Sequence, residues 1–284
     1  MNKLALNSLT QKFVDNIIKS SSSKAIGLVG SEGTGKFFVA EKITNSILGR
    51  KFLNSNYLFI DGKNEGIDEV RAVQKKLNLT TTGLKNIRRV LVINYTDELS
   101  REAQNSLLKT LEEPPLDTLI LVCITNINSI LATIKSRIDI INIRPISLQE
   151  AKNYYTGFKK EEIEKNYQIS GGKARFLDEL MKANQDSKIL QNIAYAKDIL
   201  TKNRLQRLGM VDSLTKNKTY SVTEVLDSLI VIFEATFQSS ISKNLTSSEL
   251  AKKHRYLNLT DEARNDLSHG CSPKLVLTRL FWSL

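Results

Sequence analysis

A glycine-rich turn with one lysine is the feature that most constrains the fold of this 284-residue chain. The turn spans residues 30–36, GSEGTGK, and separates the apolar run 25–29 from a helical pattern. It fits the first seven positions of the Walker A motif in the strand-to-helix context that the motif requires. Such a loop directs backbone N–H groups toward phosphate oxygens at a helix N-terminus. The candidate nucleotide-binding residues are Gly30, Gly33, Gly35 and Lys36.

Three positions that such a site uses to hold magnesium and activate water carry unsuitable residues. The eighth motif position is Phe37, which has no oxygen for a hard cation. Asn94 and Tyr95 follow the next central strand, where an aspartate and a glutamate are expected. Asn94 lacks the charge, and the unperturbed pKa of a tyrosine, about 10, is too high for a base at neutral pH. The nearest carboxylates, at positions 97–98, lie in the following turn.

These substitutions predict a degenerate site that does not hydrolyse ATP, requires no cofactor and holds no metal. Lys36 and the glycines remain, so residual binding of ATP or ADP stays open. An active ATPase is the main alternative, and a regulatory protein that binds nucleotide without turnover is a third.

The apolar runs that follow the turn predict the fold class. Two runs, residues 90–93 and 119–124, have no polar alternation and stand between helical patterns, which is typical of a parallel α/β sheet covered on both faces. Residues 57–60 and 138–143 predict two further strands. After Pro145 the pattern is helical, with a break at residues 171–172. The predicted domains are a phosphate-loop domain at 1–146, a helical lid at 147–185 and an all-helical domain at 186–284.

One helix can be predicted in detail. Ser100 is placed to cap its N-terminus, and Pro114 ends it. Its apolar face consists of Ala103, Leu107, Leu108 and Leu111.

The same helix carries a family resemblance. Residues 97–115, DELSREAQNSLLKTLEEPP, closely resemble a signature of bacterial DNA polymerase III clamp-loader subunits, which belong to the AAA+ family. Residues 132–137, ATIKSR, look like the Ser-Arg-Cys element of that family, and residues 67–71, IDEVR, resemble its segment before the second Walker strand. The resemblance covers roughly residues 8–180 and implies an AAA+ domain, a lid and a C-terminal helical collar that oligomerises. The family often has a four-cysteine zinc module, but residues 48–57 are short and contain no cysteine.

The resemblance also implies a subunit type. In this family the tau/gamma subunit keeps its ATPase residues, whereas delta-prime often loses them and keeps the serine-arginine element. The residues at positions 37, 94 and 95 therefore indicate a delta-prime-type subunit. The implied role is a non-hydrolysing structural stator of the polymerase holoenzyme. The implied partners are tau/gamma, delta, the sliding clamp and primer–template DNA, within a hetero-oligomer.

Arg137 is the candidate catalytic residue. By resemblance it is an arginine finger offered in trans to ATP on the neighbouring subunit, where a guanidinium stabilises charge on the transferring phosphoryl group. The alternative is a surface arginine that only pairs with a carboxylate. Ser136, Glu112 and Glu113 are candidate interface residues, and the alternative for the two glutamates is a simple packing helix.

Composition adds weaker constraints. The net charge of +11 fits either a protein that works beside nucleic acid or a solvated basic surface. Two cysteines cannot form a four-thiolate zinc site, and the N-terminus does not read as a signal peptide, so a cytoplasmic protein is expected. Arg175 lies where active relatives carry a phosphate-sensing arginine, with a lid-surface role as the alternative. Asn126 takes the place of a polar sensor, and Trp282 is expected to be a packing anchor.

Overall fold

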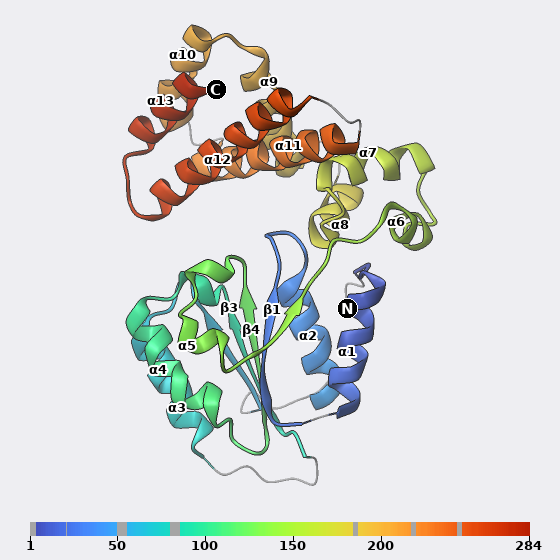
Figure 1. Ribbon diagram of the computed structural model, residues 1–284, viewed down its shortest axis with the longest axis vertical. Helices are drawn as coiled ribbons and strands as arrows, with labels where there is room; N and C mark the ends of the chain where they lie inside the picture. The colour runs from blue at the N-terminus through green and yellow to red at the C-terminus, as the bar shows by residue number, and fades with distance from the viewer. Residues whose placement is uncertain are drawn as a thin grey trace. The chain divides into compact units, whose positions relative to one another are not determined.

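The computed structural model describes residues 4–20, 22–49, 56–79, 86–183, 187–216, 220–242 and 246–284. The chain divides into two compact units (Figure 1). The first comprises Met1–Glu150 with Lys173–Phe176, and the second comprises Ala151–Gly172 with Leu177–Leu284. The first unit contains a parallel sheet and the second is helical. The predicted α/β class, with a parallel sheet followed by a helical C-terminal part, is thereby confirmed.

The sheet has five parallel strands in the order β2-β3-β4-β1-β5. Their bounds are β1 Lys24–Val29, β2 Tyr57–Asp61, β3 Arg89–Asn94, β4 Thr118–Ile124 and β5 Asp139–Asn142. The central strand β4 pairs with β1 from Lys24 opposite Leu119 to Val29 opposite Ile124. All strand carboxyl ends therefore meet at one edge, where ligand sites of open α/β sheets are built.

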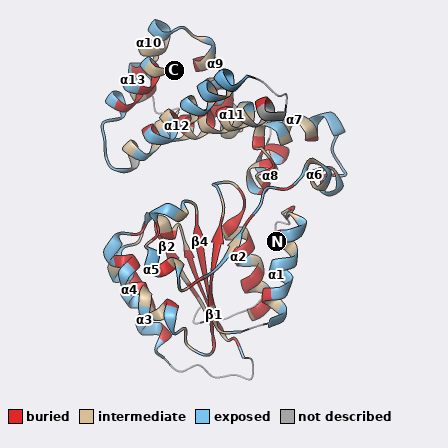
Figure 2. Cartoon of the chain, viewed as in Figure 1, coloured by how far each residue is buried: buried red, intermediate tan, exposed pale blue. Residues whose placement is uncertain are grey.

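Helices cover both faces of this sheet (Figure 1). One face carries α1 Ser8–Ser20 and α2 Lys36–Leu48, and the other carries α3 Ile67–Leu77, α4 Arg101–Glu112 and α5 Ala132–Lys135. Short 3-10 turns follow β3 and β4 at η1 Thr96–Glu98 and η2 Ile127–Ser129. Every residue of β4 is buried, and its side chains alternate between two hydrophobic clusters (Figure 2). Burial on both sides explains why this strand has no polar alternation.

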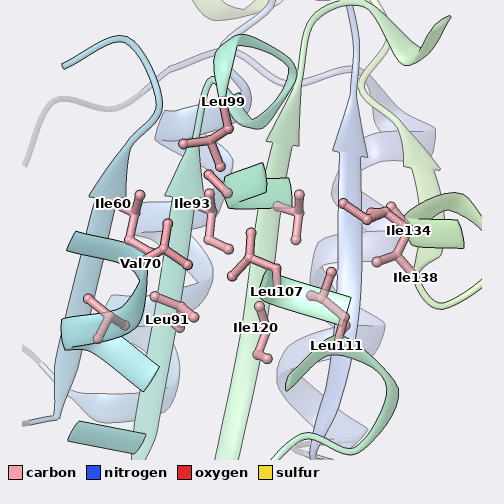
Figure 3. Close-up of a cluster of buried hydrophobic side chains, with 14 of the residues drawn as sticks. Ile60, Val70, Leu91, Ile93, Leu99, Leu107, Leu111, Ile120, Ile134 and Ile138 are labelled. Carbon is pink, nitrogen blue, oxygen red and sulfur yellow. The ribbon is translucent and has the colours of Figure 1, made fainter. Parts of the chain in front are cut away.

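Helix α4 has the predicted buried face. The Ser100 hydroxyl accepts the N–H of Ala103 at 3.2 Å and caps the helix. Ala103, Leu107 and Leu111 are buried, and Leu108 packs at the edge of the cluster. Figure 3 shows Leu107 and Leu111 packed with Leu91 and Ile120 of the sheet. The helix ends at Glu112, two residues before Pro114, as the sequence predicts.

A buried ion pair at the opposite end of the sheet was not visible in the sequence. The Arg89 Nη2 donates to Asp117 Oδ1 at 2.8 Å, and the two side chains are only 5% and 10% exposed. The Arg89 Nη1 donates to the carbonyls of Lys76 and Leu79 at 3.1 and 3.0 Å. This guanidinium therefore connects the end of α3 to the start of β3 and β4.

The second unit is built from helices. Its elements are α6 Leu148–Tyr154, α7 Lys160–Ser170, α8 Ala174–Lys182, α9 Lys188–Thr201, α10 Arg204–Lys216, α11 Val222–Ser242, α12 Ser247–Ser268 and α13 Pro273–Ser283, the first turns of α6 and α8 belonging to the first unit. Leu226, Leu229 and Phe233 are buried on one face of α11. The three-domain boundaries stay a prediction, because residues 184–186 at the lid boundary lie outside the described residues. Most of the short segment 48–57 lies outside them as well.

The expectation for Trp282 was wrong. Trp282 is 55% exposed, whereas its neighbour Phe281 is fully buried in the core of the second unit. Successive residues of a helix point about 100° apart, so the two rings of α13 face different surroundings. None of the described helices is both long enough and apolar enough to span a membrane.

Candidate functional site

The phosphate loop joins β1 to α2 at the carboxyl edge of the sheet. Gly33 and Gly35 have φ values of 82° and 92°, a left-handed backbone that glycine adopts without strain. A Cβ atom on Gly35 would lie 2.7 Å from Leu4 Cδ2, and one on Gly33 would lie 3.2 Å from the Cβ of Phe176. The fold therefore brings the predicted loop residues together and packs other parts of the first unit directly over the loop.

Lys36 is held by this loop itself. Its ammonium group donates to the carbonyls of Gly30 and Ser31 at 2.7 and 3.1 Å. Lys36 is only 7% exposed, and burial lowers the pKa of its ammonium group, while Cys123 and Glu32 oppose the shift. The lysine thus has its hydrogen bonds supplied by the protein backbone.

The start of α8 lies on the loop as well. The N–H groups of Arg175 and Phe176 both donate to the carbonyl of Gly33, at 2.9 and 3.2 Å. These bonds join the beginning of the lid segment to the loop, and Arg175 is itself exposed. The phosphate-sensing role considered for Arg175 stays a prediction.

Phe37 has a packing role. Its ring meets the ring of Phe59 edge-on at 5.5 Å, and Phe59 stacks on Tyr57 at 6.3 Å. All three rings pack against the hydrophobic cluster under α1 and α2. The side chain at position 37 therefore makes a hydrophobic contact to the edge strand β2.

Tyr95, the residue that follows β3, has a strained backbone. Its φ is 49°, and among the described residues it is the one non-glycine residue with positive φ. The Lys63 ammonium lies 3.8 Å from the centre of its ring, and its hydroxyl is 3.5 Å from Glu32 Oε1. Burial raises the pKa of Tyr95, so the hydroxyl stays protonated at neutral pH.

The Asp97 carboxylate makes a structural contact with the backbone that follows β4. Its two carboxylate oxygens accept the N–H groups of Thr125 and Asn126 at 3.0 and 2.7 Å. The Asn126 side chain in turn accepts the N–H of Asn128 at 3.0 Å and caps η2. Sequence reasoning placed Asp97 in the turn but missed this bridge between the ends of β3 and β4.

Arg137 and Glu112 form a second polar group. Arg137 lies in the turn after α5, and its Nε and Nη2 lie 2.9 and 2.8 Å from Glu112 Oε2 at the end of α4. Its Nη1 donates to the carbonyl of Thr133 at 2.9 Å and lies 3.4 Å from the Ser136 hydroxyl. The Arg137 side chain is 29% exposed and that of Glu112 is 56% exposed. The structure therefore brings Glu112, Ser136 and Arg137 together, while Glu113 is exposed at the C-cap of α4.

Several known proteins are similar to parts of this chain. The family model described as DNA polymerase III, delta subunit matches residues 50–147, which include the Arg137 site. Subunit delta' of DNA polymerase III from Haemophilus influenzae is 36% identical over 84 residues, and that from Bacillus subtilis is 32% identical over 78. Over these residues the chain is similar to delta-type subunits of bacterial DNA polymerase III. The matches to the two relatives cover 30% and 28% of this chain and about a quarter of each relative, 25% and 23%.

More distant similarities extend over longer stretches. The replication factor C small subunit of Thermoplasma volcanium is 28% identical over 182 residues, covering 59% of this chain and 57% of the relative. A solved gamma subunit-related protein from Thermotoga maritima superposes with a TM-score of 0.54 and 17% identity, covering 96% of this chain and 97% of that one. At this identity the structural likeness shows a shared fold alone.

Proposed function

We propose that this chain is the non-hydrolysing delta-prime-type subunit of a cytoplasmic DNA polymerase III clamp loader, and that Arg137 acts in trans on ATP bound to a neighbouring tau/gamma subunit. The observation that carries the proposal is the partly exposed guanidinium of Arg137, which Glu112 and Thr133 hold in one orientation. The similarity to subunits named delta' supports the same assignment.

The hydrogen bonds of Arg137 suit a finger of this kind. An arginine has five N–H donors in a rigid plane. The Glu112 carboxylate binds the edge of the guanidinium formed by Nε and Nη2, and the Thr133 carbonyl accepts one N–H of Nη1. The second N–H of Nη2 remains for an incoming oxygen. A pre-oriented guanidinium contributes more to a transition state than one that must first be ordered, because less conformational entropy is lost on binding.

The contacts around the chain's own phosphate loop support a structural role for this subunit and not a catalytic one. Phe37 packs on Phe59, Tyr95 holds a protonated hydroxyl, and Asp97 is occupied by two backbone N–H groups. These three contacts argue against magnesium binding and water activation at this loop. In this proposal the subunit needs no nucleotide of its own and serves as a stator beside the ATP-driven subunits, the sliding clamp and primer–template DNA.

Copurification tests the assignment. The tagged full-length chain is expressed in its own source cells at native level and recovered from extract, and the bound proteins are identified by mass spectrometry. We expect tau/gamma and delta subunits in near-stoichiometric amounts. Recovery of the chain without either subunit, under conditions that preserve the polymerase holoenzyme, would contradict the proposal.

The orientation of Arg137 by Glu112 gives a separate prediction. In a reconstituted loader we expect Glu112→Ala to lower the kcat of ATP turnover about tenfold, since a freed arginine is no longer pre-oriented, with KM for ATP little changed. Glu112→Gln keeps a carbonyl acceptor and is expected to restore most of the kcat. Glu102→Ala, at an exposed position in the first turn of the same helix, is the matched control and should behave as wild type. Equal effects of the alanine variants at 102 and 112 would show that Glu112 does not position the finger.

A further inference from the structure

The second unit carries a basic cleft. Its residues are far in the sequence from the phosphate loop and from the group around Arg137. It is a cavity of about 480 Å³ between the start of α10, the first half of α12 and the end of α13. Arg204, Lys252, Arg255 and Tyr256 line it, together with Ala251, Ser283 and Leu284. We call this feature the C-terminal cleft. Its volume falls in the range of small-ligand sites and would admit one nucleotide unit with its phosphate.

The three cations of the cleft are not neutralised by the protein. Over the part of the chain that the structure describes, Arg204, Lys252 and Arg255 form no ion pair with a carboxylate. Other cations of the same unit are paired. Lys188 lies 2.7 Å from Glu224, Lys274 lies 2.7 Å from Asp212, and Arg279 lies 3.4 Å from Glu262. Three uncompensated positive charges around one cavity create a local field that attracts an anion.

Aromatic rings accompany these cations. The Arg204 guanidinium lies over the ring of Trp282 at 4.8 Å from its centre, and the Lys252 ammonium lies 5.7 Å from the centre of the Tyr256 ring. Trp282 is 55% exposed, an unusual position for the largest apolar side chain. Cations that follow a phosphate backbone, beside exposed rings on which bases stack, are the combination found in single-strand-binding grooves.

We propose that the C-terminal cleft binds single-stranded DNA, with Arg204, Lys252 and Arg255 on its phosphates and Trp282 stacked against a base. The exposed ring favours a single strand over a duplex, because paired bases do not present their faces. It also favours DNA over an acidic peptide, whose carboxylates would use the cations and leave the ring exposed. This inference goes beyond the proposed function, which assigns no direct DNA contact to the chain.

The test uses the isolated full-length chain and a fluorescein-labelled oligodeoxythymidine. Anisotropy reports binding, and an unlabelled oligomer is used to read the fluorescence of Trp282, which is the single tryptophan of the chain. We expect binding to quench Trp282. The triple variant R204Q/K252Q/R255Q should weaken binding on the order of tenfold or more and reduce the slope of log K against log salt by about 2, since each phosphate contact on a single strand contributes about 0.7.

A matched variant separates the cleft from general surface charge. K188Q/K274Q/R279Q also removes three positive charges from the second unit, but from cations that are already ion-paired. We expect its DNA affinity to stay within about twofold of wild type. Circular dichroism confirms that both triple variants are folded. Equal losses in the two variants would overturn the proposal, because binding would then depend on net charge alone.

Two further arms identify the ligand. Trp282→Leu keeps the cations and should weaken oligomer binding about tenfold, since base stacking on an aromatic ring contributes about 1–3 kcal/mol. Inorganic phosphate and poly-glutamate, at matched ionic strength, should neither quench Trp282 nor displace the oligomer at equal charge concentration. Quenching or displacement by either one, or oligomer binding without quenching, would contradict a single-stranded DNA site. The outcome of this binding assay is independent of the proposed clamp-loader function, because the assay contains no other subunit.

Discussion

In a clamp loader reconstituted with this chain, Arg137→Ala is expected to reduce DNA- and clamp-stimulated ATP turnover by about 10³-fold or more, within the range of about 10³–10⁵ that arginine fingers contribute. The reason is electrostatic. The guanidinium stabilises charge on the transferring phosphoryl oxygens, so its loss lowers kcat at the neighbouring site. Steady-state turnover of the assembled complex measures the effect.

Two companion variants define what Arg137 contributes. Arg137→Lys keeps the charge but loses the planar donors that reach Glu112 and Thr133 together, so we expect only partial recovery. Arg144→Ala removes the same charge from an exposed position after β5 and should leave turnover unchanged. Assembly is checked by gel filtration before each assay. Turnover of assembled Arg137→Ala loader equal to that of wild type would show that Arg137 is a surface arginine paired with a carboxylate.

The largest expected effect on stability comes from the buried pair of Arg89 and Asp117. Asp117→Ala leaves the Arg89 guanidinium, only 5% exposed, without its carboxylate. Removing one partner of a buried pair costs about 3–5 kcal/mol, because the remaining charge stays desolvated. Hydrogen exchange of the amides in β3 and β4 measures this loss within the first unit, so the unfolding of the helical unit does not enter the result.

A surface pair provides the control. Lys24 and Asp139 lie 3.6 Å apart with side chains 34% and 70% exposed, and such pairs contribute about 0–1 kcal/mol. Asp139→Ala should therefore change exchange in the same strands very little. If Asp117→Ala and Asp139→Ala had similar small effects, the pair at the base of the sheet would not stabilise the fold in the way described.

The fold could be predicted where it depends on local pattern. The loop at 30–36, the uniform apolar runs and the capped face of α4 each follow from spacing and residue type, and the structure has all three. The predicted site residues on the loop lie together for the same reason, since the strand-to-helix turn places them there. What sequence reasoning missed are contacts between residues far apart in the chain.

Three examples show the limit in physical terms. Arg89 and Asp117 are 28 positions apart and look like ordinary charged residues until the fold buries them. Glu112 and Arg137 were each identified from the sequence, but their pairing depends on how α4 and α5 pack. Trp282 was expected inside because it is apolar, yet its angle on α13 directs it outward. Residue type indicates how readily a side chain is buried, whereas tertiary packing determines which side chains are buried in the fold.

A side-by-side comparison of two variants tests the central claim most directly. Lys36→Ala and Arg137→Ala of this chain are each assembled with wild-type partner subunits, and DNA- and clamp-stimulated ATP turnover is measured for both complexes. A subunit that acts only on its neighbour's nucleotide predicts turnover like wild type with Lys36→Ala and turnover reduced about 10³-fold or more with Arg137→Ala. The reverse pattern, with turnover lost on Lys36→Ala and kept on Arg137→Ala, would show that the chain hydrolyses ATP at its own phosphate loop.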